Sequence, residues 1–259
     1  MSGVGHLDEL YAKYKDRGLV VISVTDEARG LVDRFIEKTG AKHPIVIEKG
    51  SSADDYGITG FPSMFLIDAN GRIAVAGNPQ ESDIERLLPE AWTLPVLPKK
   101  LDAARKPLEK GDMAGARKAL DAALAGTGLE EADRTAAGEA VKWIDGRGAK
   151  MLAAADADAK AGDAHAAAVT LRKAAESFKG LEAGAKADEA LKALLAGKDT
   201  KREIDAGDVW DKLRDKVRTM KPDQAAAACR QVEKKYEGTK AAAKAAAAAG
   251  RFEAMGKGR

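Results

Sequence analysis

The stretch YGITGFPSMFLIDANGRI, residues 56–73, constrains the fold more than any other part of this chain. It opens with a turn-rich segment that contains Pro62 and continues into residues 63–68, which are predicted to form a strand. Asn70-Gly71 follows, and both residues tolerate positive φ, so the pair predicts a hairpin turn. Residues 72–76 are the expected partner strand, and the stretch therefore predicts a β-hairpin preceded by a proline loop.

The segments around this hairpin predict alternating helices and strands. Apolar residues at helical spacing indicate an amphipathic helix that ends at Arg17-Gly18. Residues 19–24 form a continuous β-branched run, which predicts a strand covered on both faces. A second helix, a short extended segment at residues 44–47 and, after the hairpin, a helix capped by Ser82 complete the series. This order predicts an α/β layer with helices on both faces of a sheet.

Two stretches resemble a known family. LDELYAKYKDRGLVVISV, residues 7–24, is similar to the first helix and following strand of TlpA/ResA-like thiol-disulfide oxidoreductases. Residues 56–73 resemble their Gly-x-Pro loop and hairpin. The resemblance implies an α/β thioredoxin-like (redoxin, AhpC/TSA-type) domain over residues 1–92. In that family the proline matching Pro62 is cis and the backbone of the preceding residue pairs with the substrate, so the resemblance implies Phe61 and Pro62 as substrate-binding residues.

The chain departs from the family at the redox centre. The family has a strand ending in Trp-Cys-x-x-Cys directly before the first helix, whereas this chain has Met1–Gly5 there. The chain contains one cysteine, Cys229. Disulfide exchange needs an attacking thiolate and a second thiol that resolves the mixed disulfide. We therefore expect no catalytic residues and no exchange activity in the chain as given, and whether the protein is an enzyme stays open.

By resemblance, the missing strand is the central one, between residues 20–24 and 64–67. Without it both neighbours are expected to present a buried, unpaired edge, at a cost of about 1–3 kcal/mol for each unmatched group. Three explanations stay open: an upstream segment that this sequence does not include, which we prefer; Pro44–Ile47 filling the gap; or a strand from a partner.

Residues 101–250 have a helical composition, rich in Ala, Lys, Asp and Glu, and follow a proline-marked linker at residues 93–100. Three weakly similar segments each open with a turn and a capping aspartate and end at a glycine. They indicate an all-α region of degenerate TPR-like helical hairpins. The spacing exceeds the ~34 residues of a TPR unit, so a bundle of Ala-rich helices is the alternative. A disordered tail is expected at residues 251–259. The caps are Asp112, Asp163 and Asp223, and the glycines are Gly126, Gly180 and Gly238.

Charge and composition exclude several function classes. The chain has 43 Lys and Arg against 41 Asp and Glu, which gives no electrostatic reason to expect a nucleic acid or an anionic membrane as partner. No apolar run approaches the ~20 residues of a membrane span. No metal site, cofactor, phosphate loop or Ser-His-Asp pattern is predicted. Cys229 is expected to be a small core or interface residue, and Trp143 and Trp210 are expected to pack between helices. His6 is expected to be a surface histidine, and His43 and His165 have no partners in the sequence that suggest chemistry.

These observations leave two hypotheses for function. The first is a thioredoxin-like (TlpA/redoxin) protein whose family role is thiol-disulfide exchange on protein substrates. The second is a non-catalytic scaffold for protein binding that joins a redox-dead thioredoxin-like module to TPR-like helices. A peroxiredoxin-type peroxidase is a weaker third possibility because it too needs a cysteine before the first helix. The expected location is the cytoplasm as the sequence is written, or the periplasm or cell envelope if an upstream signal segment is missing.

Overall fold

The computed structural model describes residues 3–48, 52–58, 60–69, 71–88, 93–217 and 219–257. The chain divides into two compact units, Met1–Thr93 and Leu94–Arg259, called here the N-terminal unit and the helical unit. The predicted linker at residues 93–100 belongs mostly to the helical unit, because Leu97 is buried in its core.

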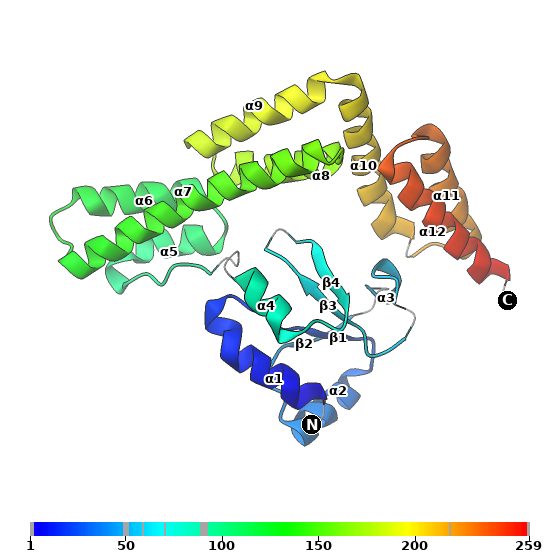
Figure 1. Ribbon diagram of the computed structural model, residues 1–259, viewed down its shortest axis with the longest axis horizontal. Helices are drawn as coiled ribbons and strands as arrows, with labels where there is room; N and C mark the ends of the chain where they lie inside the picture. Colours follow the sequence, from blue (N-terminus) through cyan, green and yellow to red (C-terminus); the bar gives the residue numbers. More distant parts are fainter. Residues whose placement is uncertain are drawn as a thin grey trace. The chain divides into compact units, whose positions relative to one another are not determined.

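The N-terminal unit has the predicted order of helices and strands (Figure 1). Its elements are α1 (Gly3–Tyr14), η1 (Lys15–Arg17), β1 (Ser23–Thr25), α2 (Arg29–Thr39), β2 (Ile45–Ile47), α3 (Ser52–Asp55), β3 (Met64–Ile67), β4 (Ile73–Gly77) and α4 (Glu81–Leu87). The hairpin predicted from residues 63–76 is present as the antiparallel β3–β4 pair. Asn70 of its expected turn lies outside the described residues.

The strands form two separate pairs. β1 runs parallel to β2, with Ser23 opposite Ile45, and β3 runs antiparallel to β4, with Leu66 opposite Val75. Within the described part of the chain no strand joins β1 to β3. β2 pairs with β1 alone, so the proposal that Pro44–Ile47 bridges the gap was wrong.

β1 is shorter and more exposed than the sequence predicts. It covers Ser23–Thr25 instead of residues 19–24, and the side chains of Val20, Ile22 and Val24 are 68%, 54% and 50% exposed. The predicted burial on both faces was wrong, because these side chains are half exposed or more. Within the described residues β1 pairs with β2 and with no other strand.

The core of the N-terminal unit is small. Tyr14, Ile84 and Leu88 are buried together, and Leu10, Leu19 and Leu66 pack against them. This cluster joins α1, α4, β3 and the segment that leads into β1. Both strand pairs are therefore attached to one hydrophobic cluster although they do not pair with each other.

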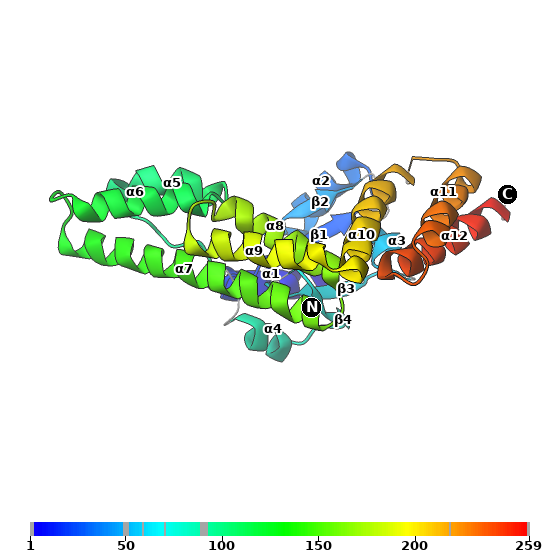
Figure 2. The same cartoon turned by 90° about the horizontal axis from the view of Figure 1, so that it is seen from above.

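The helical unit is built from close-packed helices (Figures 1 and 2). The helix α7 packs along α8 and α9, and α11 packs against α12. Many of the buried residues at these seams are alanines, whose small side chains let helices approach closely. The elements are η3 (Lys99–Leu101), α5 (Asp102–Glu109), α6 (Met113–Ala125), α7 (Glu131–Lys160), α8 (Ala164–Ser177), α9 (Glu182–Ala196), α10 (Lys198–Val217), α11 (Pro222–Lys235) and α12 (Lys240–Lys257).

Helix ends differ in how well the sequence predicts them. Asp112 and Asp163 cap α6 and α8, where their side chains accept hydrogen bonds from the backbone N–H groups of Gly115 and Ala166. Asp223 does not cap α11, because Pro222 already begins that helix and Lys221 precedes it. The tail expected to be disordered from residue 251 is helical as far as Lys257.

Candidate functional site

The predicted substrate-binding residues lie on the loop between α3 and β3. The Phe61–Pro62 peptide bond is cis, and the Phe61 side chain is 81% exposed. Ser63 closes the loop on itself, because its hydroxyl donates a hydrogen bond to the Gly60 carbonyl at 2.6 Å. The loop therefore presents an exposed aromatic residue immediately before a strand.

An aromatic contact supports the strand that follows this loop. The Tyr56 and Phe65 rings meet edge to face, with ring centroids 4.9 Å apart. Such pairs add about 0.5–1.5 kcal/mol beyond the area they bury. Tyr56 begins this loop and Phe65 belongs to β3, so the contact joins the two ends of the segment that carries Phe61 and Pro62.

Asp8, His43 and Ser23 form a hydrogen-bonded chain that the sequence analysis missed. Asp8 Oδ1 lies 2.6 Å from His43 Nδ1, and His43 Nε2 lies 2.8 Å from Ser23 Oγ. Asp8 Oδ1 also accepts hydrogen bonds from the backbone N–H groups of Lys42 and His43. The prediction that no Ser-His-Asp pattern exists was therefore wrong, as was the view of His43 as a residue without partners.

The proton position between Asp8 and His43 follows from the charge of the Asp8 carboxylate. The hydrogen bond from His43, together with those from the backbone, lowers the pKa of Asp8 below its ordinary value of 3.8, so Asp8 is ionised at neutral pH. His43 Nδ1 must then carry the proton that it donates to Asp8. In the tautomer that carries its proton on Nδ1, the imidazole Nε2 is an acceptor, and the Ser23 hydroxyl donates the 2.8 Å hydrogen bond to it.

The hydrogen bonds among Asp8, His43 and Ser23 fix α1 on the β1–β2 pair. The His43 side chain is almost completely enclosed, and the Asp8 side chain is only 16% exposed. Asp8 comes from α1, Ser23 from β1 and His43 from the segment before β2. The polar side-chain atoms of these three residues form hydrogen bonds with one another inside the N-terminal unit. These bonds fix the position of α1 relative to the strands.

A second polar cluster holds α1 against α4. The buried Tyr14 hydroxyl donates to Glu81 at 2.5 Å and lies 2.9 Å from Glu85, and Lys13 pairs with Glu81 at 2.6 Å. The hydrogen bond to Glu81 raises the pKa of Tyr14, and the one from Lys13 lowers the pKa of Glu81. The helix α1 is therefore fixed on both sides by charged hydrogen bonds.

Comparison with known proteins identifies the N-terminal unit. The Redoxin family model matches residues 2–88. These residues form a redoxin-family domain.

The relatives are thiol-disulfide oxidoreductases. The redoxin domain is 40% identical over 70 residues to thiol-disulfide oxidoreductase ResA of Halalkalibacterium halodurans, a match that covers 26% of this chain and 40% of the relative. It is 33% identical over 87 residues to ResA of Bacillus thuringiensis (strain Al Hakam), covering 32% of this chain and 50% of the relative. The chain thus spans about half the length, or less, of the curated relatives it matches. No solved structure matches the chain.

Outside the redoxin domain, the lone cysteine is not arranged for redox chemistry. Cys229 lies on α11 in the helical unit with no exposed surface, and burial raises the pKa of its thiol. A raised pKa keeps the thiol protonated and unreactive. The described residues contain no cluster of three or more His, Cys, Asp or Glu side chains that could hold a metal ion. Nor does any helix in the described ranges combine the length and apolar character needed to cross a membrane.

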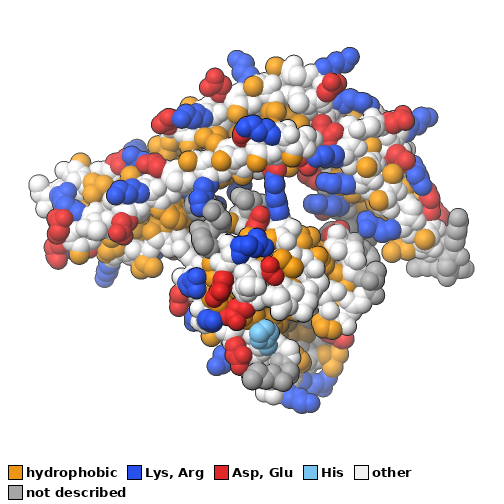
Figure 3. Space-filling view, viewed as in Figure 1, with side chains coloured by type: hydrophobic (Ala, Val, Ile, Leu, Met, Phe, Trp, Pro, Cys, Tyr) orange, Lys and Arg blue, Asp and Glu red, His pale blue; other side chains and the backbone are white. Residues whose placement is uncertain are grey.

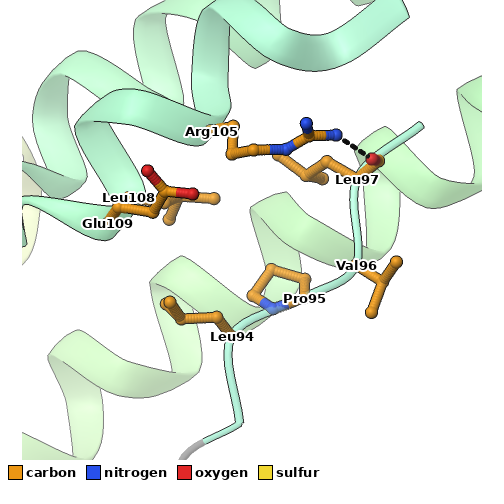
Figure 4. A pocket seen from close by; sticks show the side chains of 7 residues that line it. All are labelled: Leu94, Pro95, Val96, Leu97, Arg105, Leu108 and Glu109. Atoms are coloured by element: carbon orange, nitrogen blue, oxygen red, sulfur yellow. Dashed lines mark hydrogen bonds between the residues drawn. The ribbon is translucent and has the colours of Figure 1, made fainter. Parts of the chain in front are cut away.

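The helical unit has a pocket that is lined by segment 94–97 and by residues of α5 (Figure 4). Its volume is about 200 Å³, and segment 94–97 forms one wall and α5 the other. Arg105 donates a hydrogen bond to the Leu97 carbonyl at 2.5 Å and pairs with Asp102 at 2.8 Å. The arrangement attaches the start of the helical unit to its first helix and brings no catalytic groups together.

Proposed function

We propose that the redoxin domain takes part in thiol-disulfide exchange on protein substrates, with Phe61 and Pro62 as the residues that contact the substrate. The observation that supports this proposal most is the 81% exposure of Phe61 on the loop before β3, in a domain whose relatives are thiol-disulfide oxidoreductases. An exposed loop next to a strand can offer its backbone to an extended peptide.

The chemistry requires a cysteine pair that this chain does not contain. Exchange proceeds by thiolate attack on a disulfide and resolution by a second thiol. Cys229 is a single thiol, enclosed in the helical unit and with a raised pKa. The chain as given is therefore expected to be inactive, and activity requires a Cys-x-x-Cys segment next to the Phe61–Pro62 loop.

An insulin-reduction assay with dithiothreitol tests this proposal. We expect no activity above background for the chain as given, and activity for a chimera in which a strand ending in Trp-Cys-x-x-Cys is fused before Gly3. Changing both added cysteines to serine is the matched control and should abolish that activity. Activity of the unmodified chain that a Cys229→Ser variant loses would contradict the proposal, as would a folded but inactive chimera.

A second candidate is a non-catalytic scaffold for protein binding. It is favoured by the helical unit, which places its only cysteine inside the core, and by the aspartate caps of α6 and α8, which support a TPR-like arrangement of helical hairpins at residues 101–250. An inactive chimera whose redoxin domain is folded would favour this candidate over the first.

A further inference from the structure

His165 of α8, for which the sequence offered no partner, lies beside two carboxylates of α10. Its side chain is 15% exposed, and its Nε2 atom is 3.3 Å from Asp208 Oδ1 and 3.5 Å from Asp211 Oδ2. At neither distance is the geometry that of a hydrogen bond, so the buried Nε2 atom has no hydrogen-bond partner. Such atoms are uncommon in native folds, and each one calls for an explanation.

A glycine brings the His165 ring against the backbone of α10. Gly207 is buried in that helix, and a Cβ added there would overlap the ring. A glycine inside a helix lowers its stability relative to alanine. In return, this glycine lets the imidazole reach the carboxylates of Asp208 and Asp211. The surface of α10 is therefore shaped to receive the imidazole.

The two carboxylates differ in their other partners. Arg172 of α8 donates hydrogen bonds to both oxygens of Asp208, at 2.7 and 2.9 Å. Burial acts to raise the pKa of Asp208, but the hydrogen bond from Arg172 holds it below its ordinary value of 3.8. Asp211 has no described ion-pair partner other than His165. When the imidazole is neutral, the cluster therefore has one carboxylate more than it has cations.

Charged groups on neighbouring turns are paired with other residues. Asp163 caps the start of α8 and pairs with Lys240 of α12 at 3.3 Å, and Asp205 of α10 pairs with Lys201 at 2.6 Å. The Asp163 carboxylate also counters the positive end of the α8 dipole, which would otherwise disfavour a cation in the first turn. No described charged group of α7 or α9 forms an ion pair with His165.

The enclosure of His165 distinguishes this cluster from the surface ion pairs of the helical unit. Charged side chains of both signs are interspersed over the helical unit in the space-filling view (Figure 3). In pairs such as Lys160–Asp156, both side chains are more than half exposed. Exposed pairs contribute little to stability, whereas hydrogen bonds to charged groups contribute more than neutral ones.

The cluster lies where α10 meets α8. Ile204 of α10 packs there against Ala164 and Ala168 of α8. The helix α8 shares a core with α7 and α9, whereas α10 shares one with α11 and α12. A contact between α8 and α10 therefore affects how firmly the last three helices are held to the rest of the helical unit.

We propose that His165 is a proton-controlled contact between α8 and α10. When the imidazole takes up one proton from the solvent, both ring nitrogens become donors, and Nε2 donates to the carboxylates of Asp208 and Asp211. The neutral ring supplies no charge to Asp211. Histidine is the side chain that most readily changes its charge between about pH 5 and 8. The contact is therefore strong in mildly acidic solution and weakens as the pH rises.

Hydrogen exchange of the full chain, compared between the wild type and His165→Gln at the same pH, tests this proposal. The ratio of the two rates cancels the dependence of intrinsic exchange on pH. We expect α10 to exchange about fivefold or more faster in His165→Gln at about pH 5.5, and at nearly the wild-type rate at about pH 8.5. The helix α6 is the internal control and should exchange alike in both proteins. An equal difference at the two pH values, or none at either, would overturn the proposal.

Asp211→Asn tests the same contact from the side of α10. The Asp211 side chain is 45% exposed, so the substitution leaves the packing of the two helices in place. We expect faster exchange of α10 at the lower pH and an unchanged rate at the higher one. Asp215→Asn on the same helix, at a residue that is 73% exposed, is the matched control and should change neither.

The two aspartate variants also guard against a loss of folding. If circular dichroism shows that His165→Gln does not fold, the comparison of Asp211→Asn with Asp215→Asn decides. Equal effects of these two substitutions would show that the general charge of α10, and not a contact with His165, holds the helix, and would contradict the proposal.

Discussion

The two units use their hydrophobic residues in opposite ways. Among its described hydrophobic residues, the redoxin domain buries Tyr14, Val32, Ile84 and Leu88, while many of its large apolar side chains are exposed. The helical unit encloses large side chains such as Phe178, Leu120 and Ile204, and many of the buried residues between its helices are alanines. The difference shows that packed helices can complete a core from neighbouring segments, whereas two strand pairs that do not join within the described residues leave apolar side chains exposed.

The largest predicted effect compares one phenylalanine from each unit. Phe178→Ala removes an enclosed ring from the core of the helical unit and should cost about 3–5 kcal/mol of unfolding free energy. Phe61→Ala removes an exposed ring of the redoxin domain and should change stability by less than about 0.5 kcal/mol. Denaturant unfolding followed by circular dichroism measures both, and similar losses would contradict the comparison.

The second prediction tests how tightly the helices approach each other. A Cβ added at Gly184 would lie 2.2 Å from the Phe178 carbonyl oxygen, so Gly184→Ala should cost about 1–3 kcal/mol through overpacking. Gly146 in α7 has no such neighbour, and Gly146→Ala should stabilise the helix by about 0.5–1 kcal/mol. Chemical denaturation of the two variants gives both values. A neutral Gly184→Ala would show that the helical unit is less closely packed than described.

The third prediction concerns the fixing of α1 to α4. Tyr14→Phe leaves the ring in place and removes the hydroxyl that bonds Glu81 and Glu85. It should lower the melting temperature of the redoxin domain by a few degrees, because hydrogen bonds to carboxylates are stronger than neutral ones. Tyr11→Phe on the same helix is the control. An unchanged melting temperature for Tyr14→Phe would mean that this cluster does not stabilise the domain.

The fourth prediction is that the stability of the redoxin domain depends on pH through the hydrogen bonds of Asp8. The folded pKa of Asp8 is lowered, so its stabilising contribution is present above its ordinary value of 3.8 and is lost as the pH falls through the folded value. Wild-type stability, followed by tyrosine fluorescence, should therefore fall more steeply in acid than that of Asp8→Asn. Parallel curves for the two proteins would show that the carboxylate is not coupled to folding.

The last prediction, with the smallest expected effect on the protein, concerns the reactivity of the Cys229 thiol. Its enclosed thiol has a raised pKa, so a thiol reagent such as dithionitrobenzoate should react with the folded chain far more slowly than with the chain in denaturant. Rapid labelling of the folded chain would reopen a chemical role for this residue.

The local order of the redoxin domain could be predicted from sequence, but its longer-range arrangement could not. The hairpin of β3 and β4 follows from an apolar run and a turn, which are local signals. The length of β1 depends on its neighbours. Residues 19–24, which are apolar except for Ser23, could not by themselves show that pairing begins only at Ser23.

The candidate site shows the same limit. Phe61 and Pro62 could be found because their loop has a recognisable pattern. Asp8, Ser23 and His43 are far apart in sequence, and nothing local marks them as neighbours. The sequence offers one signal: Asp8 in the first helix and Ser23 in the strand that follows are both polar. Considering the two together as hydrogen-bonding residues could have pointed to this site. Asp223 shows the converse error, in which a local capping pattern was overridden by Pro222.

Hydrogen exchange at two neighbouring amides tests the central claim most directly, which is that the edge of β1 opposite β2 pairs with no strand among the described residues. In the free chain, the Val24 amide should exchange much faster than the Ser23 amide, because only Ser23 donates to β2, through the Pro44 carbonyl. Equal protection of the two amides would show that a strand already occupies the edge, and would contradict the account.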